Sequence, residues 1–216
     1  MAYYFRPRAN TILRLVLFGL VLLIVFIAWA GAMIVRSPYE NFQNEPREQP
    51  VPFSHEHHAG GLGIDCRYCH TTVETSSFAG IPPTRTCMNC HSEMWASSSA
   101  LAPVRESYRT GRSIEWTRVH DLPQFVYFAH NIHVSKGVGC STCHGRVDRM
   151  PLTWKAQPLT MEWCLNCHRN PELYVRPRAL VFDMTYQPPT NQSDIGQGLV
   201  KEYGIRSLTS CSTCHR

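Results

Sequence analysis

The chain has 216 residues, of which 10 are cysteine, 11 are histidine and 44% are hydrophobic. Its formal net charge is +5, but four of the 21 basic residues flank an N-terminal apolar segment. The remainder carries nearly equal numbers of basic and acidic residues, which gives no support for nucleic-acid binding. The length accommodates one domain of ordinary size together with a membrane anchor.

The N-terminal segment predicts a transmembrane helix. Leu15 to Val35 are 21 residues without a charge, and at about 1.5 Å per residue such a helix crosses a hydrocarbon core of about 30 Å. Arg6, Arg8 and Arg14 precede it, so the positive-inside rule places the N-terminus in the cytoplasm. We expect residues 1–36 to form a cytoplasmic stub and an anchor. The alternative is a cleaved signal peptide, because Ala28-Trp29-Ala30 resembles a cleavage site, but the apolar run is longer than a signal peptide requires.

The rest of the chain contains two similar units. Residues 37–52 are polar and rich in proline, which predicts a linker. We expect residues 53–216 to form one domain on the outer side of the membrane. Within it, segments 53–91 and 128–168 both begin with F-x-H-x-x-H and continue with two C-x-x-C-H motifs. A fifth such motif stands alone at 211–215.

The five C-x-x-C-H motifs use every cysteine in the chain. Each motif is typical of a site where haem c is attached, because two thiols at this spacing reach the two vinyl groups of one porphyrin. Disulfides would not explain a histidine after each pair, and tetrahedral Cys₄ zinc sites need an even number of C-x-x-C units. We therefore predict five covalently bound haems, attached through Cys66 and Cys69, Cys87 and Cys90, Cys140 and Cys143, Cys164 and Cys167, and Cys211 and Cys214.

The histidines divide into two sets of predicted iron ligands. The motif histidines supply the proximal ligands His70, His91, His144, His168 and His215. Each F-x-H-x-x-H element places two more histidines three residues apart on one helical face, which predicts His55, His58, His130 and His133 as distal ligands. The fifth distal ligand is less constrained: we favour His120, with Met161, Met184, His57 or an open site as alternatives.

Iron with two strong axial ligands has no open position for a substrate, so this ligand set predicts electron transfer. We expect no catalytic residue in the chain. Because glycine and proline interrupt many segments, we predict a mostly irregular fold with short helices and few or no strands, built from class III cytochrome-like repeats. The haems would supply much of its interior.

Four segments resemble the pentahaem cytochrome c subunit (ActA) of alternative complex III. The resemblance covers about Pro52 to Arg169 and rests on PFSHEHHAGGLGIDCRYCHTTVE, FAGIPPTRTCMNCHSEMW, RVHDLPQFVYFAHNIHVSKGVGCSTCHG and LTMEWCLNCHR. The F-x-H-x-x-H elements are also similar to those of class III (c3 and c7) cytochromes. Residues 170–210 match no motif of the family.

The resemblance implies an electron-relay subunit of a quinol:electron-acceptor oxidoreductase in the bacterial inner (cytoplasmic) membrane, with its haem domain in the periplasm. It implies three partners: a membrane quinol-oxidising subunit, an iron–sulfur subunit, and a monohaem cytochrome c or copper protein as acceptor. The alternative is a stand-alone, membrane-anchored multihaem quinol dehydrogenase of the NapC/NrfH type.

Overall fold

A computed structural model describes residues 6 and 8–215 and divides the chain into two units, Met1–Phe42 and Gln43–Arg216. The first unit holds α1 (Ala9–Arg36) and the single-turn α2 (Pro38–Asn41). Helix α1 contains the one described segment that is long and apolar enough to cross a membrane, and none of its residues is buried. Residues 1–5 and 7 of the predicted stub lie outside the described residues.

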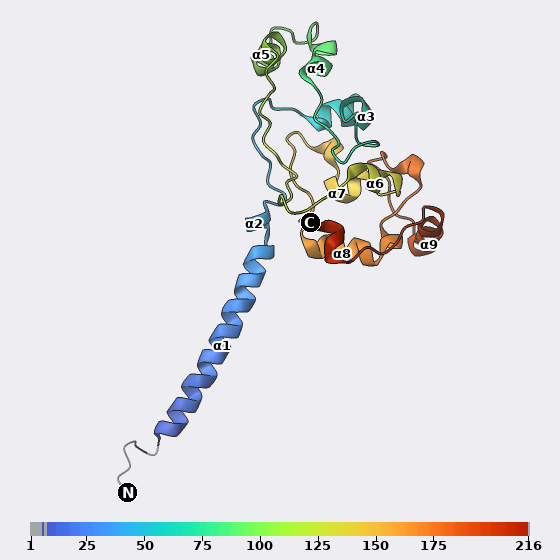
Figure 1. Ribbon diagram of the computed structural model, residues 1–216. Coiled ribbons are helices and arrows are strands. Elements are labelled where there is room, and N and C mark those ends of the chain that lie inside the picture. The colour runs from blue at the N-terminus through green and yellow to red at the C-terminus, as the bar shows by residue number, and fades with distance from the viewer. Residues whose placement is uncertain (1–5, 7, 216) are drawn as a thin grey trace. The chain divides into compact units, whose positions relative to one another are not determined.

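The second unit consists of short helices joined by irregular segments (Figure 1). Residues 43–215, all described, form no strand and make only isolated β-bridges. This confirms the predicted fold class. The helical elements are η1 (Glu56–Gly61, a π-helix), α3 (Cys66–Cys69), α4 (Thr84–His91), η2 (Ser99–Leu101), α5 (Ala102–Thr110), α6 (His130–Ser135), α7 (Cys140–His144), η3 (Val147–Arg149), α8 (Met161–Arg169), η4 (Pro171–Leu173), η5 (Arg178–Leu180), α9 (Gln192–Glu202) and α10 (Cys211–Cys214).

The two sequence repeats take similar local structures. In each repeat the first motif lies on a single helical turn, α3 or α7, and the second motif ends a longer helix, α4 or α8. Side-chain caps explain two of these helix starts: Asp65 accepts a hydrogen bond from Arg67 N, and Thr160 accepts one from Trp163 N. The F-x-H-x-x-H elements differ, since the first continues as a π-helix and the second as an α-helix.

Each F-x-H-x-x-H element packs on the opposite repeat. In the first repeat, Glu56 N donates to Met150 O at 3.1 Å, and in the second His130 N donates to Ser77 O at 3.1 Å. Gly60 permits the first of these contacts, because an added Cβ would lie 2.2 Å from Asp148 O. The two repeats therefore interlock and do not form independent halves.

The later part of the predicted linker is hydrogen-bonded to other segments of the second unit. Asn44 N donates to Lys155 O at 2.8 Å, and Gln49 Nε2 donates to Thr117 O at 2.9 Å. The largest apolar cluster lies in the C-terminal region, where Val175, Leu199 and Tyr203 are buried together. The unmatched segment 170–210 thus contains η4, η5 and α9 and contributes this small core.

Candidate haem-binding centres

The ten cysteines lie on single helical turns, two on each turn, and none is paired in a disulfide. Residues three apart on a helix share one face, so the thiols of each pair point the same way with the motif histidine next to them. This arrangement matches what covalent attachment of one porphyrin requires.

Hydrogen bonds made by the ring atom Nδ1 orient most of the predicted iron ligands. The Nδ1 atoms of His70, His91 and His215 lie 2.6, 3.0 and 3.3 Å from the carbonyl oxygens of Gly80, Met94 and Phe125. A ring that donates its Nδ1–H to a carbonyl keeps Nε2 free to bind a metal, which is the usual arrangement in metal sites. The predicted distal ligands follow the same pattern: Nδ1 of His58, His130 and His133 contacts Ser54 O, Ser77 O and Ala129 O at 2.8, 2.9 and 2.8 Å, and Nδ1 of His55 contacts Thr153 Oγ1 at 3.0 Å.

Ring spacing provides a direct test of whether these histidines fit haem iron. Iron–nitrogen bonds of about 2 Å on both sides of the metal place the centres of two trans imidazoles about 6 Å apart. The ring centroids of His58 and His91 are 6.1 Å apart, and those of His133 and His168 are also 6.1 Å apart. His130 and His144 are separated by 6.4 Å. Three distal–proximal pairs therefore have the spacing that a haem between them requires.

The phenylalanine of each F-x-H-x-x-H element holds both histidines in the same way. Phe53 stacks on His58 at 4.5 Å and meets His55 edge-on at 4.9 Å. Phe128 stacks on His133 at 4.3 Å and meets His130 edge-on at 4.9 Å. The repeated spacing in sequence thus reflects a repeated geometry around the ligands.

Five histidines gather between the two repeats. Burial, followed by the influence of His120, His130, His70 and His55, depresses the pKa of His144 well below its usual value. Burial also lowers the pKa of His55 to about 4, and among its histidine neighbours His70 has the largest effect. His144 and His55 are therefore held neutral, which is the protonation state that binds metals.

His120 occupies this central cluster and is not seen beside the fifth motif. Its ring lies 4.2 Å from that of His144, which is too short for two imidazoles on opposite sides of one iron. Its Nε2 is buried without a hydrogen-bond partner, so it fits a ligand or a contact that the polypeptide alone does not provide. The only ring contact of His215 in the described part of the chain is with Phe125 at 5.7 Å. The structure therefore does not bring His120 and His215 together.

The three alternatives for the fifth distal ligand lie in different places. His57 is exposed and stacks on Trp95. Met184 is buried beside the third motif, in a pocket that Ser141 and Thr142 line. Met161 is exposed and begins α8, one turn before Cys164.

Interactions between thiols join the motifs in an order that differs from their order in the sequence. The Cys66 thiol of the first motif lies beside the Cys140 thiol of the third, and this proximity lowers the pKa of Cys66. After burial, neighbouring thiols also raise the pKa values of Cys69, Cys143 and Cys164: Cys87 acts on Cys69, Cys167 and Cys164 act on Cys143, and Cys214 acts on Cys164. The motifs therefore succeed one another as second, first, third, fourth and fifth. Figure 1 agrees: α4 and α3 lie toward one end of the second unit, α7 is central, and α8 lies near the C-terminus.

Comparison with known proteins agrees with this geometry. Residues 31–105 match the model of the class III cytochrome c family, and residues 126–216 match that of cytochrome c7 and related cytochromes c. The menaquinone reductase multihaem cytochrome c subunit of Nitratidesulfovibrio vulgaris is 31% identical over 173 residues, which cover 70% of this chain and 79% of that protein. This chain belongs to the multihaem cytochromes c.

Several residues that shape this multihaem cytochrome were not identified from the sequence. Ser77 and Thr153 orient His130 and His55 from the opposite repeat. Arg176 is buried against the third motif, where its guanidinium bonds to Thr142 Oγ1 at 3.1 Å. No local spacing in the sequence distinguishes these residues, because each acts through a contact between distant segments.

Proposed function

We propose that this cytochrome carries five haems and relays electrons within a membrane-bound, quinone-linked oxidoreductase complex. The observation that carries the proposal is that thiols of different attachment motifs lie near enough to influence one another's pKa values, in a succession from the second motif at one end to the fifth at the other. The haems supply one-electron chemistry, and the chain supplies their spacing, axial ligands and shielding.

The proposed axial pairs are His58 with His91, His130 with His144, His133 with His168, and His55 with His70. His215 is the proximal ligand of the fifth haem, and His120 remains a candidate ligand through its unpartnered Nε2. Six-coordinate iron changes its charge without binding a substrate, so this ligand set suits relay rather than turnover.

The quinone site is proposed to lie in another subunit. Leu15 to Val35 contains no ionisable side chain that could accept the protons of a quinol, and none of the residues of α1 is buried. We infer that α1 anchors the chain in the bacterial inner membrane with residues 53–216 on the periplasmic side. As in alternative complex III, a membrane subunit would react with quinone, an iron–sulfur subunit would adjoin it, and a monohaem cytochrome c or copper protein would exchange electrons at the outer side.

Two directions of electron flow follow from the two resemblances. Similarity to the ActA subunit favours quinol oxidation, with electrons leaving toward a periplasmic acceptor. The relative from N. vulgaris is named for menaquinone reduction, which favours flow from a periplasmic donor toward quinone. Assays of the intact complex in both directions, with quinol plus oxidised cytochrome c and with reduced cytochrome c plus quinone, distinguish these two candidates.

The test of the relay is to compare the chain alone with the chain in its complex. The complex is purified in mild detergent, its partners are identified by mass spectrometry, and the haem content is measured by intact mass. We expect the isolated chain to carry five haems and to accept electrons from dithionite, but to oxidise quinol only within the complex. Quinol oxidation by the isolated chain at the rate of the complex would instead support a stand-alone NapC/NrfH-type dehydrogenase.

A further inference from the structure

Arg176 is a buried cation whose hydrogen bonds go to neutral groups. Its relative exposure is 5%, and its guanidinium donates to Asp183 O at 3.3 Å and to Thr142 Oγ1 at 3.1 Å. It makes none of the ion pairs seen among residues 8–215, and the Asp183 carboxylate is instead bonded to Thr185. The charge is therefore retained in the interior without a carboxylate in direct contact.

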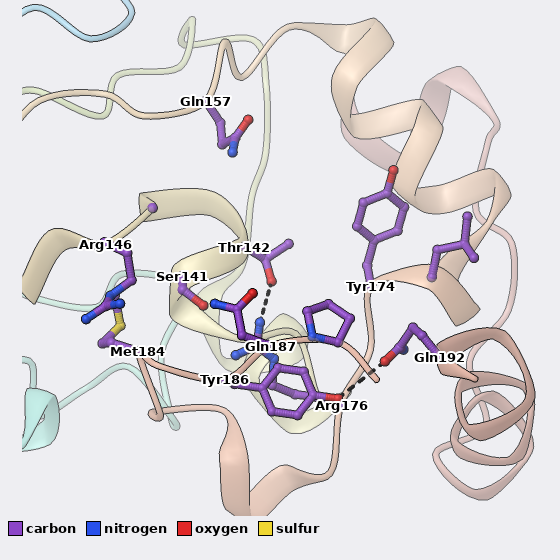
Figure 2. Close-up of a pocket in the computed structure, with 13 residues that line it drawn as sticks. Ser141, Thr142, Arg146, Gln157, Tyr174, Arg176, Met184, Tyr186, Gln187 and Gln192 are labelled. Atoms are coloured by element: carbon purple, nitrogen blue, oxygen red, sulfur yellow. Dashed lines mark hydrogen bonds between the residues drawn. The ribbon is translucent and has the colours of Figure 1, made fainter. Parts of the chain in front are cut away.

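The guanidinium lies against the third attachment motif. Figure 2 shows Arg176 bonded to Thr142 beside the ring of Tyr186, and Cζ lies 4.3 Å from the centroid of that ring. A Cβ added at Gly139, the residue before Cys140, would lie 2.2 Å from Cζ. Arg176 Nε is also buried without a partner. The positive charge is thus held against the peptide that leads into the haem-bearing turn.

A buried, unpaired charge is costly, so stability alone does not account for it. Its electrostatic effect on nearby groups is strong, because a protein interior screens the interaction between charges far less than water does. A haem that accepts one electron becomes more negative by one unit, and a nearby fixed cation favours that state. The net charge and burial around a haem are among the principal determinants of its potential.

We propose that Arg176 stabilises the reduced state of the haem attached at Cys140–His144 and raises its reduction potential above the value that axial ligation alone would set. This inference rests on the proposed function, since it requires a haem at the third motif. In the succession of motifs, the third is the middle member. A raised potential there makes this haem the electron reservoir of the relay and gives an energetic difference between two repeats with otherwise similar ligands.

The experiment is a spectroelectrochemical titration of the full haem-loaded chain, followed by electron paramagnetic resonance to separate the five haems. Arg176→Met and the more polar Arg176→Gln remove the charge, while Arg176→Lys keeps it. Arg178→Met is the matched control, because Arg178 also lies over a tyrosine ring, 4.1 Å from the centroid of Tyr203, but is exposed. The resonance that changes in His130→Ala marks the haem of the third motif.

We expect one potential, that of the third haem, to fall in the Met and Gln variants and to stay near the wild-type value in Arg176→Lys and Arg178→Met. Gly139→Ala, which displaces the guanidinium while keeping its charge in the chain, should shift the same haem in the same direction. Intact mass must show five haems in each variant, which tests attachment separately from tuning. Unchanged potentials in a fully loaded Met or Gln variant would overturn the proposal, as would equal shifts in the Met and Lys variants.

Discussion

The thiol of Cys66 lies beside the thiol of Cys140, so the first motif of one repeat abuts the first motif of the other. The cross-repeat bonds of Glu56 N to Met150 O and of His130 N to Ser77 O hold the same junction. Haems attached at these two turns would therefore be held close to each other. The junction explains why the order of motifs in space begins with the second rather than the first.

Substitution by alanine should have opposite effects on stability at two glycines of α9. A Cβ at Gly196 would lie 1.9 Å from Glu172 O, a backbone atom that cannot easily yield, whereas a Cβ at Gly198 would meet nothing within 4 Å. We expect Gly196→Ala to destabilise the domain by about 2 kcal/mol. Gly198→Ala should stabilise α9 by roughly 0.5–1 kcal/mol, because alanine loses less backbone entropy. Thermal unfolding of the haem-loaded variants measures both, and equal effects would contradict the packing of α9 against η4.

The attachment motifs, the F-x-H-x-x-H elements, the apolar helix and the scarcity of strands could all be predicted, because each depends on local spacing or composition. The succession of the motifs could not, since it depends on contacts such as Cys66 with Cys140 between separate repeats. Likewise residues 170–210 contain no motif, and their fold rests on the close approach of Gly196 to Glu172 and on the burial of Val175 with Tyr203. The sequence predicts His120 as a ligand, but it does not give its neighbours, because these depend on how the segment after α5 packs against the third motif.

The depressed pKa of Asp65 should make the stability of the protein fall measurably in acid. Hydrogen bonds from the Arg67 side chain, and then from its backbone, lower the pKa of Asp65 from 3.8 to about 2. A carboxylate with a depressed pKa stabilises the fold above its unfolded pKa, and this contribution is lost as the pH falls from about 4 through about 2. Loss of the cap in Asp65→Ala should cost about 1 kcal/mol at neutral pH. Asp65→Asn keeps the cap, so it should cost less at neutral pH. Both variants should lack the acid-dependent loss, which unfolding between pH 2 and pH 7 would show.

His120→Ala should perturb a haem of the central cluster. The ring contact with His144, at 4.2 Å, and the buried Nε2 place His120 next to the third motif. We therefore expect one altered low-spin signal by electron paramagnetic resonance, with the signal of the fifth haem unchanged. Met161→Leu is the complementary variant, because Met161 lies one turn before Cys164 and Cys164 interacts with Cys214 of the fifth motif. A change in the fifth haem on replacement of His120 would show that this histidine reaches the terminal site instead.

The first F-x-H-x-x-H element provides a ligand and its control in adjacent residues. His58 lies 6.1 Å from His91 and anchors its Nδ1 to Ser54 O, while His57 is exposed and stacks on Trp95. We predict that His58→Ala converts one of the five haems to a high-spin form that binds carbon monoxide, because the iron loses one of its two strong ligands.

His57→Ala should leave all five haems low-spin. The second repeat offers an independent check, since His133 and His168 have the same 6.1 Å separation. His133→Ala should therefore produce the same change in a different haem, and the double variant His58→Ala/His133→Ala should contain two high-spin haems. Visible absorption, electron paramagnetic resonance and carbon monoxide titration count them. If His57→Ala opened a haem and His58→Ala did not, the proposed pairing of His58 with His91 would be wrong.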